Sequence, residues 1–298
     1  MTTMTPSVKN RFRIIANPAA GRMPRRDKQR RLAAAARILN ASVHGLDTDS
    51  PEAFTDCARR TAARCDVLVV AGGDGTFSQV INILGESPAA LAFLPLGTGN
   101  ALSWALGYRR RDVADAARRI RGGRVRQFDL VDCGDGKRAF MVSLGMEGSA
   151  IRNYERLKSR GVRGLPAHAV AAASAYFRDY RPTSARIALD DETVRVDALL
   201  SLMVVKQPFY GFGMKVVPQA SWDDGLLHAL WYSDSATSLL LGLATAATIG
   251  NRSGQYRTGR RIAINLAAPV WLQVDGETVR RGRHFTFTVL PKAVAVMC

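Results

Sequence analysis

Two glycine-rich segments in the first third of the chain have the composition of phosphate-binding loops. The sequence GGDGT at residues 72–76 follows the strand-like run DVLVVA at residues 66–71, and GTGN at residues 97–100 follows the apolar run 91–94. A glycine loop between a buried strand and a helix lets backbone N–H groups approach an anion closely and points the positive end of the helix at it. Each segment is therefore predicted to bind phosphate.

Asp74, inside the first of these loops, indicates that a cation accompanies the phosphate. A carboxylate repels a neighbouring phosphate unless a cation lies between them or a proton has to be removed there. A Mg²⁺ ion shared with ATP would satisfy both groups. An Asp-Gly pair also forms simple turns, but the apolar strand before GGDGT favours the metal-binding interpretation. The chain contains neither GxxxxGK[ST] nor GxGxxG, so the loops differ from both common nucleotide fingerprints.

The elements that position these loops alternate along the first 130 residues. Short aliphatic runs are followed by amphipathic stretches, a pattern typical of βα units around a parallel sheet. Residues 13–16 are an expected strand, residues 32–39 have helical spacing, and Ser50 before Pro51 is typical of a helix start. We expect an α/β nucleotide-binding domain with a parallel sheet over residues 1–130.

The remainder of the chain has a different pattern. Strand-like runs alternate with tight turns, which lie at Asp135-Gly136, Asp190-Asp191 and Asp275-Gly276. These features predict a β-rich sandwich domain over residues 131–290, interrupted by a helix over residues 166–180. The tail 291–298 is expected to return to the first domain.

Composition restricts the location of the protein. Apolar residues make up 47% and charged residues 22%, as in globular proteins. The longest apolar stretch, residues 238–250, is shorter than the roughly 20 residues that span a bilayer. Residues 1–13 lack the apolar segment of a secretory signal, and the four cysteines have no CxxC spacing. We expect a cytoplasmic protein without a disulfide framework or structural zinc.

The formal net charge of +17 must attract anionic partners. Nucleic acid, anionic lipid headgroups and nucleotide phosphates all qualify. Binding to nucleic acid rests on charge alone, because the chain has neither aromatic platforms nor a recognisable basic reading helix, and no specific nucleic acid is expected. The basic runs lie at residues 22–31, 109–111, 118–126, 257–261 and 280–283.

Three motifs in a fixed order resemble the diacylglycerol kinase catalytic family, which includes bacterial lipid kinases and the sphingosine and ceramide kinases. They are Asn17-Pro18 with Gly21, then GGDGT, then PLGTGN at residues 95–100. The second half of the chain adds weaker matches, DDGLL at residues 223–227 and DGE at residues 275–277. Together the motifs extend over nearly the whole chain.

The resemblance implies that ATP with Mg²⁺ binds in a cleft between the two domains and that a phosphoryl group passes to a hydroxyl of a membrane lipid. The implied nucleotide contacts are Asn17, Pro18, Ala19, Ala20, Gly21, Thr48, Gly72, Gly73, Asp74, Gly75, Thr76, Phe77, Ser78, Gln79, Gly97, Thr98 and Asn100. The implied proton acceptor is Glu277, with Asp275 as the rival candidate. A general base must reach the lipid hydroxyl, and the sequence leaves both carboxylates open.

Two cation sites follow from the same resemblance. Asp74 and Asp129 would lie at the catalytic metal. Ser221, Asp224 and Leu226 would hold a second, structural cation through one carboxylate and two backbone carbonyls, although Asp224 also fits a plain turn. Many bacterial members have an aspartate after the loop asparagine, where this chain has Ala101. The sphingosine-kinase-like branch shares Asn-Ala-Leu at this place.

Two alternatives and several partners accompany this interpretation. An NAD kinase-like enzyme also uses GGDGT, and a non-catalytic protein that binds anionic lipid with a decayed kinase site would explain Ala101. The expected partners are a membrane lipid substrate and the anionic inner face of the membrane, with a homodimer as a further candidate. Diacylglycerol, phosphatidylglycerol, a sphingoid base and a glycolipid precursor all stay open as acceptors. Residues 209–214 and 239–249 are candidate walls of an acyl-chain groove.

Overall fold

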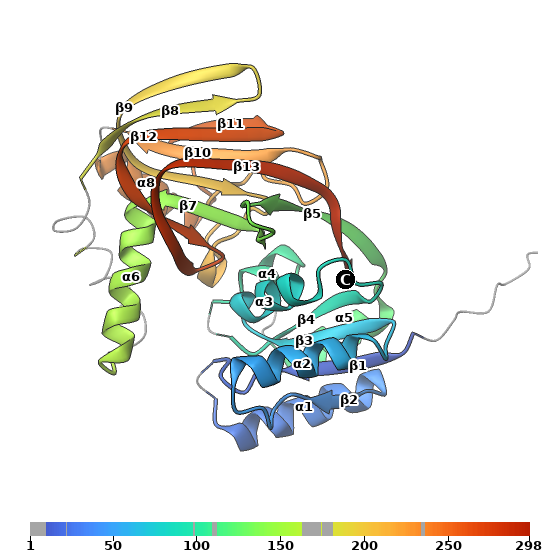
Figure 1. Cartoon of the computed structure of the whole chain (residues 1–298). Helices are drawn as coiled ribbons and strands as arrows, with labels where there is room; N and C mark the ends of the chain where they lie inside the picture. Colours follow the sequence, from blue (N-terminus) through green and yellow to red (C-terminus); the bar gives the residue numbers. More distant parts are fainter. Residues whose placement is uncertain are drawn as a thin grey trace, which may run out of the picture. The chain divides into compact units, whose positions relative to one another are not determined.

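The computed structural model divides into two compact units, shown in Figure 1. One unit consists of the residues up to Gln127 together with Val294–Cys298, and the other of Phe128–Ala293. The structure describes residues 10–21, 23–97, 99–108, 112–162, 174, 181–233 and 236–298. The expected helix over residues 166–180 therefore lies almost entirely outside the described residues.

The first unit is a parallel sheet with the strand order β4-β3-β1-β2. Its strands are β1 (Phe12–Ala16), β2 (Ser42–His44), β3 (Val67–Gly72) and β4 (Ala90–Pro95). Its helices are α1 (Arg25–Leu39), α2 (Pro51–Ala62), α3 (Asp74–Leu84), α4 (Ala101–Ala105) and α5 (Val113–Gly122). All residues of β3 and β4 are buried, as expected for parallel strands with helices on both faces.

The helices form two packed pairs, α1 with α5 and α2 with α3. With this strand order, the general rule of right-handed crossovers predicts that the two pairs lie on opposite faces of the sheet. The helix start expected at Ser50 is confirmed, because the Ser50 hydroxyl oxygen accepts a hydrogen bond of 3.1 Å from the N–H of Ala53. Pro51 occupies the first turn, where the missing N–H costs nothing.

The end of the chain belongs to the first unit. Val296, in the last residues of β13, pairs in parallel with Leu91 of β4. Cys298 and Arg124 exchange backbone hydrogen bonds of 2.9 and 3.1 Å. This pairing extends the sheet beyond β4 and holds residues 294–298 in place.

The second unit is mostly antiparallel, with the strand order β11-β10-β9-β7-β12-β13. Strand β8 pairs with both β12 and β9, and β5, which leads in from the first unit, pairs with β6 and β13. The strands are β5 (Val125–Asp132), β6 (Arg138–Ala139), β7 (Met141–Gly145), β8 (Thr183–Leu189), β9 (Glu192–Val205), β10 (Leu227–Ser233), β11 (Gln255–Gly259), β12 (Arg261–Val274) and β13 (Glu277–Met297). The helices are α6 (Met146–Ser159), the 3₁₀ turn η2 (Gly211–Gly213) and α8 (Ala236–Ala246).

The turns of the second unit confirm the sequence pattern at two hairpins. Asp135-Gly136 and Asp275-Gly276 both have positive φ at each residue, the conformation that tight two-residue hairpins require. The core is formed by apolar residues of β7, β9, β10 and β12, around the fully buried Trp231. Strands β7 and β10 and the second half of β9 are buried almost continuously, so side chains on both faces of these strands are covered.

The apolar stretch at residues 238–250 forms α8 and the turns after it. Leu239 is buried, whereas Leu241 and Leu243 are 56% and 42% exposed. Among the described residues, no helix has both the length and the apolar character needed to cross a bilayer.

Candidate active site

Three loops of the first unit meet at the carboxyl edge of its sheet, as the strand order β4-β3-β1 requires. They lie at residues 17–21, 73–76 and 96–100. Gly21 has a φ of +67°, and a Cβ atom there would collide with the carbonyl oxygen of Leu96. A Cβ atom on Gly97 would lie 2.6 Å from the Cα atom of Gly73. The three motifs singled out in the sequence are therefore neighbours, and glycines let their backbones touch.

The second loop leads directly into α3, with Gly73 as the N-cap. The first N–H groups of a helix have no acceptor within it, and its amino end carries a partial positive charge. The first intrahelical bond, 3.1 Å long, runs from the N–H of Phe77 to the carbonyl oxygen of Gly73. The amide groups from Asp74 to Thr76 thus form the part of the helix that suits a phosphate.

Phe77 does not have the nucleotide-contacting role implied for it. Its side chain is 1% exposed and packs edge to face against Phe93, with the ring centres 5.6 Å apart. Its N–H is already bonded to Gly73, so neither group is available to a ligand. Ser78 is also buried, and Gln79 is half-buried.

The Asn17 side chain connects the first loop to α3. Its Nδ2 donates to the hydroxyl oxygen of Thr76 at 3.3 Å, and its Oδ1 accepts from the N–H of Ala19 at 2.8 Å. Under this loop the buried Lys28 donates from Nζ to the carbonyl oxygen of Pro18 at 2.5 Å, and burial lowers its pKa. Sequence reasoning missed Lys28, because it stands in a basic run that resembles a solvated helix face.

Thr48 follows β2, the remaining strand of the sheet. Its hydroxyl donates to the carbonyl oxygen of Gly45 at 2.7 Å, and its N–H donates to the same oxygen at 3.2 Å. Gly45 has a φ of +89°, and a Cβ atom there would lie 2.8 Å from the carbonyl oxygen of Ala16. Thr48 therefore belongs to a turn at the same carboxyl edge as the three loops.

Asp74 has a structural partner that the sequence did not reveal. Its Oδ2 accepts from the N–H of Ala101 and its Oδ1 from the N–H of Leu102, both at 2.9 Å. The carboxylate thus caps the amino end of α4, which begins at Ala101. A carboxylate has about four lone-pair positions, so a capping aspartate can bind more than the two N–H groups.

Asn100 directly precedes Ala101, the residue whose N–H binds Oδ2 of Asp74. It adopts a left-handed conformation with φ of 45°, and its Nδ2 donates to the carbonyl oxygen of Gly97 at 2.8 Å. Within the described part of the chain, its buried Oδ1 has no hydrogen-bond partner, an arrangement that is costly without a ligand. Oxygen atoms from a carboxylate and an amide are ligands that Mg²⁺ prefers, and Asp74 and Asn100 carry such atoms. The described residues contain no group of three or more His, Cys, Asp or Glu side chains that could hold a metal ion. Ala101 adds only its N–H, and Thr98 lies outside the described residues.

In the second unit, Asp275 and Glu277 differ sharply in their surroundings. The Asp275 carboxylate accepts from the N–H of Phe140 at 3.2 Å and from the N–H of Met141 at 3.0 Å. Glu277 is exposed, and in the described structure no hydrogen bond or ion pair engages its carboxylate. Asp275 therefore holds the turn in place, and Glu277 has the carboxylate that is open to a proton.

A buried lysine occupies the place where a structural cation was expected. The Nζ atom of Lys206 lies 2.7 Å from Asp224 Oδ1, 2.6 Å from the carbonyl oxygen of Leu226 and 3.1 Å from Asp129 Oδ2. The Lys206 side chain has no exposed surface. Two of the three expected cation ligands thus already bind an ammonium group, and a divalent ion fits only if Lys206 moves away. The third, Ser221, donates from its N–H to His228 Nε2 at 3.2 Å.

Asp129, implied as a ligand of the catalytic metal, binds protein groups through both carboxylate oxygens in this structure. It is 2% exposed, its Oδ2 accepts from the N–H of Gly225 at 2.8 Å, and its Oδ1 accepts from the N–H of Lys292 at 2.9 Å. With Lys206 as a further donor, both oxygens are engaged. Asp129 lies in β5. It therefore links this strand to the loop that precedes β10 and also to β13.

His228 completes this buried cluster. Its Nε2 lies 2.9 Å from Asp224 Oδ2, and its Nδ1 lies 2.7 Å from the hydroxyl oxygen of Tyr256. Burial lowers the pKa of His228, and the neighbouring Asp224 offsets part of this effect. Sequence reasoning missed Lys206 and the pairing of His228 with Asp224. The usable signal was a lysine directly after the apolar run Leu202–Val205, since a lysine in such a position has to be paired.

Two family models match almost the whole chain. Residues 11–133 match the model described as the diacylglycerol kinase catalytic domain, and residues 140–298 match the YegS C-terminal NAD kinase beta sandwich-like domain. The chain belongs to the diacylglycerol kinase catalytic-domain family of lipid kinases. The two-domain architecture expected from the sequence is thereby confirmed.

This lipid kinase is similar to curated proteins over nearly their full lengths. It is 27% identical to a diacylglycerol kinase of Staphylococcus saprophyticus over 284 residues, which cover 91% of this chain and 90% of that protein. It is 25% identical to a diacylglycerol kinase of Bacillus subtilis, with 90% and 89% covered. A crystal structure of a diacylglycerol kinase from Bacillus anthracis has the same fold, with a TM-score of 0.70, 19% identity and 96% of each chain covered.

Proposed function

We propose that the protein transfers the γ-phosphoryl group of ATP to a hydroxyl of a membrane lipid, with a diacylglycerol-like lipid as the first acceptor to test. The observation that carries this proposal is the junction of three glycine loops at one sheet edge. There Asp74 accepts from the N–H of Ala101, and the residue before it, Asn100, has a buried Oδ1 without a hydrogen-bond partner among the described residues. The curated relatives are named diacylglycerol kinase, which supports the acceptor.

The residues of the first unit would bind the triphosphate. The amino-terminal turn of α3 supplies N–H groups, and the Asn17–Thr76 hydrogen bond keeps the first loop beside it. Mg²⁺, when bound, would neutralise charge on the transferred phosphoryl group. Asp74 and Asn100 would hold that ion, and Ala101 and Leu102 would orient Asp74 through their N–H groups.

Proton removal would fall to Glu277. The lipid hydroxyl oxygen forms a bond to the γ-phosphorus while the bond from that phosphorus to the ADP oxygen breaks. The hydroxyl proton passes to the Glu277 carboxylate, which is exposed and has no partner within the described chain. Asp275 supports this step by holding the turn between β12 and β13 in its left-handed conformation.

The acceptor requires access to a membrane. We propose a cytoplasmic protein that binds peripherally at the inner face, because each arginine or lysine near an anionic surface contributes about 1 kcal/mol of attraction. The net charge of +17 supports this location. Sedimentation with anionic and with neutral vesicles would measure it.

Radiolabelled ATP with a panel of acceptors tests the reaction. The panel contains diacylglycerol, phosphatidylglycerol, a sphingoid base and NAD, the last of which detects an NAD kinase-like activity. Incorporation of label into a lipid, and its loss in Asp74→Asn, is the expected result. If only NAD became labelled, NAD would be the acceptor and the proposed lipid acceptor would be wrong.

A further inference from the structure

Helix α8 and the turn after it, residues 247–251, have no charged side chain anywhere in their sequence. Leu241, Leu243 and Ile249 are nevertheless exposed. Ile249, at 69%, has the largest exposed fraction of all the large apolar side chains in the described part of the chain. Exposed apolar side chains that gather in one segment mark a surface that contacts another molecule or a membrane.

Helix α8 is apolar on its exposed side as well as on its buried side. Leu239 and Ala246, seven positions apart, are buried and so face the core of the second unit. Leu241 and Ala244, three positions apart, form an exposed side, with the exposed Leu243 next to them. A helix at a water-facing surface usually has polar residues on its outer side, whereas an outer side rich in leucine suits the interface of a bilayer.

The turn after α8 holds Ile249 in a fixed position. The N–H groups of Ile249 and Gly250 both donate to the carbonyl oxygen of Thr245, at 3.0 and 2.8 Å. Gly250 has a φ of +92°, a conformation that glycine adopts without strain. The next residue, the buried Asn251, donates from Nδ2 to the carbonyl oxygen of Val216 at 3.0 Å. The turn is therefore anchored on the unit, and its backbone keeps the Ile249 side chain at the surface.

Two basic residues stand beside Ile249. Lys215, Ile249 and Arg252 line the same hollow, which has a volume of about 340 Å³. The backbone of Lys215 is fixed against the end of α8, because its N–H donates to the carbonyl oxygen of Ala246 at 2.8 Å and its carbonyl oxygen accepts from the N–H of Asn251 at 2.9 Å. Long cationic side chains reach the headgroups of a bilayer while neighbouring apolar side chains enter it. Basic residues next to exposed apolar ones therefore suit an anionic membrane surface.

We propose that α8 and the turn after it form the surface by which this protein docks on an anionic bilayer. Leu241, Leu243 and Ile249 enter the boundary between headgroups and acyl chains, and Lys215 and Arg252 lie at the headgroup phosphates. A two-fold contact with a second copy would bring the same patch of each copy together, and its basic residues would then face like charges. An anionic bilayer attracts them instead. This inference rests on the proposed function, which requires an acceptor that lies in a membrane.

Sedimentation with vesicles measures the docking. The full-length protein, without ATP, is mixed with phosphatidylcholine vesicles that do or do not contain phosphatidylglycerol. Ile249→Gln should lower the partition onto the anionic vesicles about tenfold, because one apolar side chain no longer leaves water. Arg252→Gln should lower it about fivefold at low ionic strength, which is the contribution of one cation near an anionic surface.

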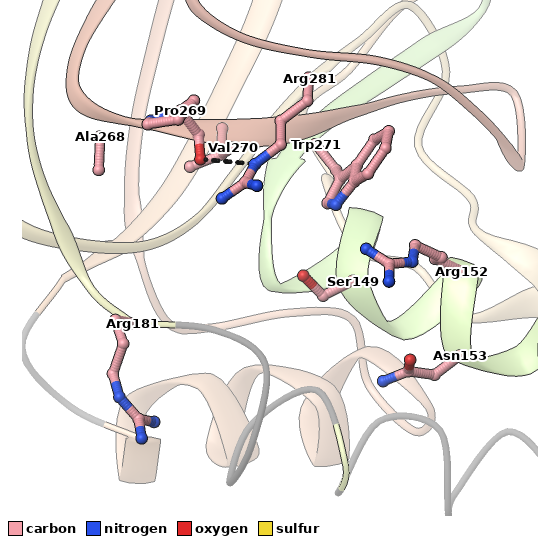
Figure 2. Close-up of a pocket in the computed structure, with 9 residues that line it drawn as sticks. All are labelled: Ser149, Arg152, Asn153, Arg181, Ala268, Pro269, Val270, Trp271 and Arg281. Carbon is pink, nitrogen blue, oxygen red and sulfur yellow. Dashed lines mark hydrogen bonds between the residues drawn. The ribbon is translucent and has the colours of Figure 1, made fainter.

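Val125→Gln and Arg281→Gln are the matched controls. Val125 is 49% exposed at the start of β5 and belongs to the first unit, so its variant loses a comparable apolar surface elsewhere. Arg281 is an exposed residue of β13 that lines another cavity, shown in Figure 2, and no highly exposed apolar side chain is among the described lining of that cavity. Both controls should bind anionic vesicles better than the α8 variants. Equal losses in controls and α8 variants would show that no particular surface docks, and the proposal would be wrong.

Brominated lipids locate the contact without removing an apolar residue. Ile249→Trp adds a tryptophan at the turn, and bromine atoms on the acyl chains quench the emission of tryptophans that enter the bilayer. The fraction of emission quenched by anionic vesicles should be larger than in the unaltered protein, whose four tryptophans provide the baseline. Equal fractions would place the turn outside the bilayer and contradict the docking.

Two further measurements separate the docking from its alternatives. Turnover of Arg252→Gln on a short-chain diacylglycerol dissolved as monomers should equal that of the unaltered protein, because no bilayer takes part. Absence of turnover in the unaltered protein on every acceptor, with vesicle binding retained, would contradict the kinase proposal and not the docking. If Ile249→Gln changed the oligomeric state in sedimentation equilibrium but bound vesicles as before, the surface would join two copies of the chain, and bilayer docking would be wrong.

Discussion

The Nζ atom of Lys206 lies 2.7 Å from Oδ1 of Asp224, and the lysine side chain is fully buried. The register of β9 and β10 explains this contact, because His228 pairs with Val205 and so places Lys206 beside the residues that precede β10. A permanent side-chain cation thus binds the oxygen atoms that the family resemblance assigned to a metal ion. Removing one partner of a buried ion pair leaves the other charge uncompensated, which is strongly destabilising.

Replacing the lysine should expose this dependence. We expect Lys206→Met to lower the free energy of unfolding by about 3–5 kcal/mol, because Asp129 and Asp224 lose their shared cation. The variant should also gain stability from added Mg²⁺, since the freed oxygens suit a hard cation. Urea unfolding with Mg²⁺ and with EDTA measures both effects. Lys137→Met, in the turn before β6, is the control and should change the free energy of unfolding little. If Mg²⁺ stabilised the unaltered protein as much as Lys206→Met, the Lys206 ammonium group could not be the cation that occupies this place.

Stability should depend on pH through His228. Burial lowers its pKa below the ordinary value of 6.5, so the folded protein favours the neutral ring. Below about pH 6.5 the unfolded chain binds a proton that the folded chain resists, and the free energy of unfolding falls as the pH decreases further. The pKa of Asp224 is lowered from 3.8, so its protonation affects the free energy of unfolding only in more acidic solution.

Urea unfolding between about pH 7 and about pH 5 checks this window. The slope should be smaller in His228→Gln, because glutamine does not titrate. His284→Gln, at an exposed position of β13, is the control and should keep the original slope. If the free energy of unfolding had the same pH dependence in all three proteins, His228 would not be the cause of that dependence.

Asp74→Asn should have two separable effects. Turnover should be lost because the carboxylate charge at the nucleotide loops disappears. The free energy of unfolding should also fall by about 1–3 kcal/mol, since one of the two N–H groups at the start of α4 loses its acceptor. Asp112→Asn is a matched control, because Asp112 caps α5 by accepting from the N–H of Ala114 at 2.9 Å. It should keep full turnover, and an active Asp74→Asn would sink the proposed metal role.

Glu277 and Asp275 should respond differently to loss of charge. Glu277→Gln should reduce kcat by about 100-fold to 10,000-fold, the usual contribution of a general base, without changing the melting temperature. Asp275→Asn should lower the melting temperature, because its carboxylate accepts from two backbone N–H groups. Steady-state kinetics and thermal unfolding of both variants show which carboxylate acts in the reaction and which one stabilises the fold. If Asp275→Asn were stable but inactive while Glu277→Gln stayed active, Asp275 would be the proton acceptor in place of Glu277.

Adding a single methyl group tests the contact between Gly73 of the second loop and Gly97 of the third. Gly97→Ala should weaken ATP binding and lower stability, because its Cβ atom would lie 2.6 Å from the Cα atom of Gly73. A Cβ atom on Gly122, at the end of α5, meets nothing within 4 Å, so Gly122→Ala should be tolerated. Calorimetric titration with ATP compares the two variants, and equal affinities would show that the loops can move apart.

Local patterns in the sequence were sufficient for the architecture and for the position of the nucleotide loops. The apolar strands before GGDGT and PLGTGN, and the helical spacing after them, are set by residues close together in the chain, and side-chain periodicity reports such elements directly. Parallel order then brings the carboxyl ends of β1, β3 and β4 to one edge. The expected Ser50 helix start and the Asp275-Gly276 turn are local in the same way.

Only the tertiary structure decided which charged side chains meet. Asp74 reaches α4 across 27 positions and Lys206 reaches Asp224 across 18, and in both cases strand register sets the contact. Arg152 and Trp271 meet through the packing of α6 on β12. No local pattern encodes these pairs, because a charged residue in a basic run or a tight turn has the same sequence signature whether it faces water or a buried partner.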